Sequence, residues 1–214
     1  MIQLYYKVVN ITNGQRNNAT KLYRNYGGKM YKTINDARAI RSKQWIYEAL
    51  VDLISKKKYD DIKITDLIKK AGVGRSTFYR NYDVIDDVIM EKLDSTFYDF
   101  YTFIFNSDFK AETDISPKLF IPFFSYWDTR SDILELIIKA DKINLLNKRL
   151  KQSVGVIIET YEIFSNFTET DNEYATEIMV GVLSSVLVKW IKDEKKVSTK
   201  KLADTLIRTL FTVR

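Results

Sequence analysis

Residues 65–82 carry the pattern that most constrains the fold, because they predict two short helices on either side of a glycine. Thr65 is a candidate N-terminal cap, and Asp66 falls in the first turn, where a carboxylate favours the positive end of the helix dipole. Apolar side chains then recur at three- and four-residue spacing as far as Gly72, whose permissive backbone suits a C-terminal cap. We therefore expect a first helix of about two turns that ends at Gly72.

The segment after this glycine predicts a second helix with one packed side and one free side. An advance of 100° per residue places Phe78 and Tyr82 on one side. The remaining positions carry hydroxyl, guanidinium and phenol groups, which bond phosphate oxygens and base edges. This order of elements is typical of a helix-turn-helix, whose second helix enters a DNA groove. On this segment alone, an ordinary surface helix with solvated polar groups is the alternative.

Residues 43–97 resemble the DNA-binding domain of the tetracycline-repressor (TetR) family. The similarity rests above all on IT at 64–65, AGVG at 71–74 and STFYRNY at 76–82. It implies an all-α homodimer that binds a palindromic double-stranded DNA operator, most often a repressor released by a small molecule. It also implies that phosphates are contacted chiefly by Thr77 and Tyr79 and bases by Arg75, Ser76 and Arg80. The whole implied DNA-binding set is Thr65, Arg75, Ser76, Thr77, Tyr79, Arg80 and Asn81.

One position departs from the family pattern. Members usually have a lysine near the start of the fourth helix, where it binds a phosphate, whereas this chain has Ile85. The carboxylates of Asp83, Asp86 and Asp87 lie beside it in the sequence and would repel DNA. The rival hypothesis is therefore a helical protein with a degenerate DNA-binding head that acts through protein–protein contacts.

The chain contains neither cysteine nor histidine. Disulfides, thiolate nucleophiles and thiolate metal sites are therefore impossible, and the usual general base and commonest transition-metal ligand are missing as well. Acid–base chemistry would have to rest on Asp, Glu, Lys or Tyr, and no spacing singles out such a pair. We expect no enzyme activity, no catalytic residue, no metal site and no cofactor.

The formal net charge of +6 is unevenly distributed along the chain. Residues 1–82 carry 17 basic and six acidic side chains, whereas residues 83–214 carry 17 basic and 22 acidic ones. The first part therefore has a charge of +11 and the second a charge of −5. A polyanion would be attracted to the part that contains the helix-turn-helix, as expected of a nucleic-acid-binding end.

Three regions are expected. Residues 1–35 form a basic arm, flexible or loosely packed, and residues 36–83 form the DNA-binding domain, in which Trp45 belongs to an apolar stripe and is expected in the core. Residues 84–214 form an all-helical ligand-binding and dimerisation domain, which begins with a long helix free of proline and glycine. No apolar run reaches the ~18 residues of a membrane span, and the start lacks a signal peptide. We expect a cytoplasmic protein without membrane contact.

An aromatic cluster follows, with 12 of the 29 aromatic residues lying within residues 97–127. Such a cluster can line a pocket for a small apolar or aromatic ligand, as the family resemblance implies. The alternative is an aromatic core without a cavity. Pro117 and Pro122 are expected to mark breaks between helices in this segment. The candidate ligand-binding residues are Phe97, Tyr101, Phe105, Phe120, Phe124 and Trp127.

The last two predicted helices cover residues 174–193 and the segment capped by Ser198. Small residues at Gly181, Ser184 and Ser185 let a facing helix come close. Two such helices from each of two chains would form a four-helix interface about a two-fold axis, and burial within one chain is the alternative. The candidate dimer-interface residues are Ile178, Val182, Ser185, Val186, Trp190, Leu206 and Leu210.

Overall fold

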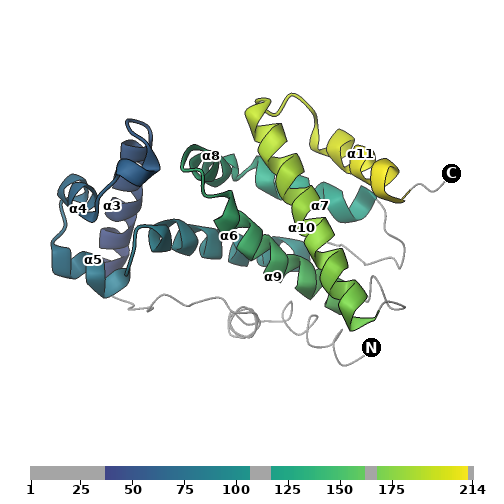
Figure 1. Cartoon of the computed structure of the whole chain (residues 1–214), viewed down its shortest axis with the longest axis horizontal. Coiled ribbons are helices and arrows are strands. Elements are labelled where there is room, and N and C mark those ends of the chain that lie inside the picture. The colour runs from purple at the N-terminus through teal and green to yellow at the C-terminus, as the bar shows by residue number, and fades with distance from the viewer. Residues whose placement is uncertain (1–36, 107–116, 162–167, 212–214) are drawn as a thin grey trace.

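The computed structural model describes residues 37–106, 117–161 and 168–211. Every regular element in these ranges is a helix, which confirms the predicted all-α fold. The elements form a small head at one end of the molecule and a larger body, joined by a single long helix (Figure 1). The predicted arm at residues 1–35 lies outside the described residues.

The head contains α3 (Ala37–Ile54), a short 3₁₀ helix η1 (Tyr59–Asp61), α4 (Ile64–Ala71) and α5 (Arg75–Asn81). Of the head helices, α4 packs most extensively against α3. The head thus has the three helices that a helix-turn-helix unit needs, with α3 as the support behind the other two.

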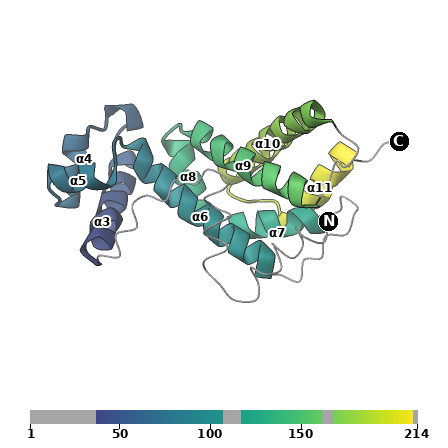
Figure 2. The ribbon, with the colours of Figure 1, turned by 90° about the horizontal axis from the view of Figure 1, so that it is seen from below.

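The connection from head to body is α6 (Asp86–Asn106), the long helix predicted at the start of the second domain. Figure 2 shows it running from the foot of the head along the body without a break. It packs on α3 in the head and on α7, α8 and α9 in the body. A shift of this helix would therefore change its packing against both the head and the body.

The body consists of α7 (Pro117–Asp128), α8 (Ser131–Lys139), α9 (Ile143–Tyr161), α10 (Glu169–Lys192) and α11 (Thr199–Phe211). In the body, α10 packs chiefly on α9, and α11 packs chiefly on α7. The two last helices therefore rest on different neighbours, as Figure 1 shows.

The predicted break at Pro122 was wrong, because this proline lies inside α7. Proline removes its own backbone donor, here the bond to the carbonyl of residue 118, and its ring crowds that carbonyl. The side chains of Phe123 and Phe124 follow directly and are 7% and 0% exposed. Their burial favours continuation of the helix beyond the proline.

The prediction that Trp45 lies in the core was also wrong, since 49% of this residue is exposed. Trp45 sits one 100° step from Ile46, which is fully buried. The buried stripe of α3 runs through Ile46, Ala49 and Leu50, and Trp45 lies beyond its edge. The prediction, which used helical spacing alone, therefore assigned Trp45 to the buried stripe incorrectly.

The body core contains an ion pair between Asp94 on α6 and the Nε atom of Arg149 on α9, with both side chains only 6% exposed. The other end of the guanidinium donates from NH1 to the side-chain oxygen of Gln152 at 2.7 Å. The pair therefore joins the connecting helix to the centre of the body through a charged contact that is shielded from water.

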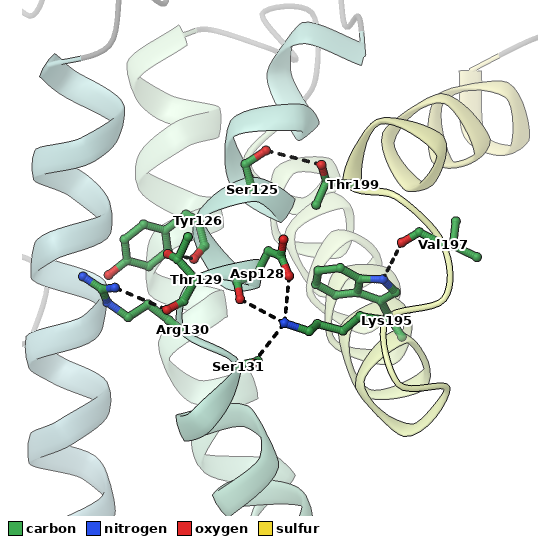
Figure 3. A network of polar contacts seen from close by, with 10 residues as sticks. Ser125, Tyr126, Asp128, Thr129, Arg130, Ser131, Lys195, Val197 and Thr199 are labelled. Carbon is green, nitrogen blue, oxygen red and sulfur yellow. Dashed lines mark hydrogen bonds and ion pairs between the residues drawn. The ribbon is translucent and has the colours of Figure 1, made fainter.

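The loop between α10 and α11 is fixed to the corner between α7 and α8. Lys195 Nζ lies 2.9 Å from the Asp128 carboxylate, 3.3 Å from the carbonyl of the same residue and 3.4 Å from the Ser131 hydroxyl (Figure 3). The indole N–H of Trp190 donates to the Val197 carbonyl at 2.7 Å. These contacts hold the carboxyl end of α10 against the body.

Candidate nucleic-acid interface

The amino end of α4 is capped by a carboxylate rather than by a hydroxyl. Lys63 occupies the cap position, and its N–H donates to the Asp66 carboxylate at 3.2 Å. Asp66 also forms an ion pair with Lys57 at 2.6 Å. The hydrogen bond from Lys57 and that from the Lys63 N–H lower the pKa of the Asp66 carboxyl. The predicted cap at Thr65 was wrong: Thr65 is the second helical residue and is exposed.

The turn between α4 and α5 is built as predicted. Gly72 has φ 66°, a left-handed conformation that favours glycine, and its N–H reaches the Lys69 carbonyl at 3.4 Å. The N–H of Val73 donates to the Ile68 carbonyl at 3.1 Å, which completes the termination of α4. The turn therefore sets the angle between the two helices.

Gly72→Ala is expected to lower the free energy of unfolding by about 1–2 kcal/mol, because an alanine in the left-handed region carries that conformational cost. No atom lies within 4 Å of the added Cβ, so the cost is one of backbone conformation alone. Denaturant unfolding measures the change. Gly74→Ala is the matched control, because φ is −75° there and the nearest atom to a Cβ is 3.9 Å away. Equal losses for both variants would contradict the conformational explanation.

The inner side of α5 is packed against the rest of the head. Phe78 is 0% exposed and Tyr82 is 3% exposed, which confirms the predicted packed side. The Tyr82 hydroxyl donates to Glu91 on α6, and Lys43 on α3 pairs with the same carboxylate at 2.5 Å. Both contacts hold the end of α5 at a defined place in the head.

The outer side of α5 carries the predicted polar groups. Arg75, Ser76, Tyr79 and Arg80 are all exposed, and helical geometry places them within a 140° arc. Neither arginine has an ion-pair partner among the described residues. Such uncompensated guanidiniums attract phosphate groups and can bond guanine edges.

Three further predicted residues take different positions. Thr77 and Asn81 are half-buried, and the Asn81 amide donates to the Thr77 carbonyl at 2.8 Å. Thr65 is exposed on α4, and Lys69 follows it one turn later on the same exposed side. Lys69, whose ammonium has no ion-pair partner in the described part of the chain, was missed by the sequence reasoning. Its spacing of four residues from Thr65 could have revealed it.

Two of the three carboxylates beside Ile85 are held by contacts within the molecule. The Asp87 carboxylate accepts the N–H groups of Asp83 and Val84 at 2.8 and 3.1 Å, so it caps α6. Asp86 accepts the Tyr59 hydroxyl at 2.5 Å and pairs with Lys142 at 3.3 Å. Two of the three carboxylates that were expected to repel DNA therefore have structural partners. The Ile85 side chain packs partly against the core.

The candidate ligand residues lie in the body core as far as they are described. Phe97, Phe120, Phe124 and Trp127 are each at most 4% exposed. The rings of Phe97 and Trp127 pack edge to face with centroids 5.2 Å apart. The side chains of Tyr101 and Phe105 lie outside the described residues. Dense ring packing is compatible with the plain-core alternative, so ligand binding stays a prediction.

The candidate dimer residues divide into two groups. Ile178 is 60% exposed and Leu210 is 37% exposed. Ser185 is exposed as well, and Val182 and Val186 are half-buried.

The other two members are buried in the body. Trp190 is only 3% exposed and Leu206 only 4% exposed, so neither presents a surface to a partner. For these two residues the alternative, burial within one chain, describes the structure. Helices α10 and α11 pack on α9 and α7 with these side chains inward. Dimerisation itself stays a prediction, and it now depends on the candidate residues that are not buried.

One helix in the described residues, α10, is long and apolar enough by length and composition to cross a membrane, and 33% of its most apolar window is buried. A core helix of a soluble protein passes the same test.

Comparison with protein families gives a result for the body. Residues 114–212 match a model described as the C-terminal region of a transcriptional regulator. The match spans α7 to α11 and excludes every residue of the helix-turn-helix, so it is independent of the motifs in the head. No curated protein matches the chain.

Proposed function

Since this chain belongs to the TetR family of transcriptional regulators, we propose that it binds double-stranded operator DNA as a homodimer and represses transcription until a small molecule releases it. The outer side of α5 carries the proposal, because its arginine, hydroxyl and phenol groups are exposed while Phe78 fixes the inner side. Such a helix is suited to the major groove. We divide the chain accordingly into a DNA-binding domain at 36–83 and a ligand-binding and dimerisation domain at 84–214.

The proposed DNA-binding residues are those predicted from the sequence, together with Lys69. Arg75 and Arg80 supply two guanidiniums per head without competing carboxylates in the described residues. The carboxylates beside Ile85 were the reason to consider a degenerate head, and the contacts of Asp86 and Asp87 weaken that reason. A DNA-binding role also favours the cytoplasm as the place of action.

The test is binding of the protein to the DNA upstream of its own gene, measured by fluorescence anisotropy over a range of salt concentrations. We expect a duplex from that region to bind about 10³-fold or more tightly than a random duplex of the same length. The logarithm of the binding constant should fall linearly with the logarithm of the salt concentration, because each phosphate contact releases counterions. Equal affinity for both duplexes would contradict operator recognition and favour the protein–protein alternative.

The homodimer is proposed to form through the exposed face of α10. Tyr174 and Ile178 are one turn apart and are 68% and 60% exposed, and the small residues Gly181 and Ser185 continue the same stripe. A second copy of this face across a two-fold axis would cover the apolar surface, and the small residues would let the helices approach. Leu210 on α11, which is 37% exposed, is proposed to belong to the same interface.

Ile178→Glu is expected to raise the dimer dissociation constant by about 100-fold or more, because the two-fold axis brings two buried carboxylates close together. Sedimentation velocity would show a shift from dimer to the 25.1 kDa monomer at a fixed concentration. Val51→Glu is the matched control, since Val51 is 40% exposed on α3, outside the proposed interface. A dimer that survives Ile178→Glu would place the interface elsewhere.

The effector is proposed to be a small apolar or aromatic molecule bound in the body near the aromatic cluster. The indole Nε1 of Trp127 is buried and has no hydrogen-bond partner among the described residues. A ligand with an acceptor atom would satisfy it. Saturation-transfer NMR with a panel of aromatic and aliphatic compounds tests this assignment. Loss of the signal in Trp127→Phe, with folding retained, supports it; binding that is unchanged in this variant contradicts it.

A further inference from the structure

The head touches the body through three side chains that come from three different elements. Tyr59 belongs to η1 in the head, Asp86 begins α6, and Lys142 lies in the corner between α8 and α9. Lys142 Nζ lies 3.3 Å from the Asp86 carboxylate and 4.7 Å from the centre of the Tyr59 ring. The Tyr59 hydroxyl donates to the same carboxylate at 2.5 Å. Each of the three groups therefore contacts both of the others.

The corner holds Lys142 in place through its backbone. Asp141 adopts φ 54°, a left-handed conformation that is uncommon for a residue with a side chain. The N–H of Asp141 donates to the Ile138 carbonyl at 3.2 Å, and the N–H of Lys142 donates to the Ile137 carbonyl at 3.0 Å. The end of α8 and the turn after it thus fix the point from which the lysine side chain extends.

On the head side, the contact leads to the amino end of α4. Tyr59 is only 8% exposed and packs in the head core, where Ile62 follows it. Two residues later α4 begins, and Lys57 on the other side of η1 is paired with Asp66 in its first turn. A displacement of η1 would therefore move the amino end of α4, which carries Thr65.

We propose that Lys142 is a positioning residue for the DNA-binding head, which it holds at a defined angle on the body through Asp86 and Tyr59. The expected effect on DNA binding rests on the proposed function. The contact of Lys142 with Asp86 and Tyr59, and its effect on the position of the head, do not. Outside α6, the head also contacts the body where α3 packs on α8. The Lys142 contact combines an ion pair with a fixed direction.

The first experiment compares Lys142→Met with Lys142→Arg in operator binding. Methionine keeps the length of the side chain but removes the charge, whereas arginine keeps the charge. We expect methionine to weaken operator binding by about 5-fold or more and arginine to restore most of it. In a protein that already carries Tyr59→Phe and Asp86→Asn, Lys142→Met should cause no further loss of operator affinity, because both partners of Lys142 have already been altered. A merely structural role would lower thermal stability without this dependence on the partners.

The second experiment measures the position of the head relative to the body in the absence of DNA. The chain has no native cysteine, so Ser55→Cys on the head and Lys200→Cys on the body can be spin-labelled selectively. Both positions are exposed, and neither is one of the three contact residues. We expect the distribution of label distances, measured in protein diluted with unlabelled chain, to broaden or shift in Lys142→Met and to stay narrow in Lys142→Arg.

The two experiments separate the inference from the proposed function. If the wild-type protein shows no preference for its upstream DNA, the proposed function fails, and the label distances still decide whether Lys142 positions the head. If the distances in Lys142→Met coincide with those of the wild type, the positioning role is overturned, whatever the protein binds.

Discussion

Arg80→Ala should weaken operator binding by about 1–3 kcal/mol for each head, if the guanidinium reaches a base, and should relax sequence preference at that base. The side chain is exposed on the outer side of α5 and has no carboxylate partner in the described residues, so its loss removes no internal contact of that kind. The fold should be retained because the packed side, with Phe78, is untouched. Anisotropy titrations with the operator and with single-base variants measure the change.

Lys200→Ala is the control for this experiment. It also removes one exposed positive charge, but from α11 in the body. A loss of long-range attraction alone would affect both variants similarly, whereas a direct contact would affect Arg80→Ala much more. Unchanged operator affinity in Arg80→Ala would remove this residue from the DNA-binding set.

Arg149→Leu is expected to lower the free energy of unfolding by about 3–5 kcal/mol, because it leaves the Asp94 carboxylate buried without its cation. The pair connects α6 to α9 and both side chains are 6% exposed, so water cannot replace the guanidinium. Urea denaturation monitored by circular dichroism measures the change. A loss of this size is a large fraction of the stability of an ordinary domain.

Two comparisons identify the cause of that loss. Combining Asp94→Leu with Arg149→Met should recover most of the stability, because both members of the buried ion pair are then replaced by apolar groups. Lys189→Ala breaks an exposed ion pair with Asp193 at 2.8 Å and should change stability by less than about 1 kcal/mol. If the double replacement were as unstable as Arg149→Leu, lost packing rather than the buried charge would be the cause.

The local pattern of the sequence was enough to predict the helix-turn-helix. The glycine that ends α4 and the packed side of α5 depend on backbone conformation and on a 100° periodicity, both of which are visible over a few residues. Ser198 was likewise predicted as a cap, and its hydroxyl accepts the Lys201 N–H at 3.3 Å. Interactions between residues that are close in the sequence, such as caps and helical periodicity, can be predicted from a short stretch of it.

Predictions that depended on packing between elements were less accurate. Trp45 has the helical spacing of a core residue, yet none of the described helices covers its side of α3 fully, and it stays half-exposed. Thr65 has the chemistry of a cap, but the Asp66 carboxylate, which also pairs with Lys57, caps the helix by accepting the Lys63 N–H. Trp190 and Leu206 were assigned to a partner and are covered by their own chain instead. In each case a competing contact, distant or nearby, decided the position.

By itself, the sequence determined that the chain is helical, where the recognition helix lies and which of its sides is packed, because these follow from short-range periodicity and capping. The tertiary structure alone decided that Asp86 is a partner of the head and the body rather than a charge that repels DNA. Tyr59, Asp86 and Lys142 are separated by 27 and 56 positions along the chain, and no local pattern relates them. Their meeting depends on how η1, α6 and the corner between α8 and α9 pack around a shared core.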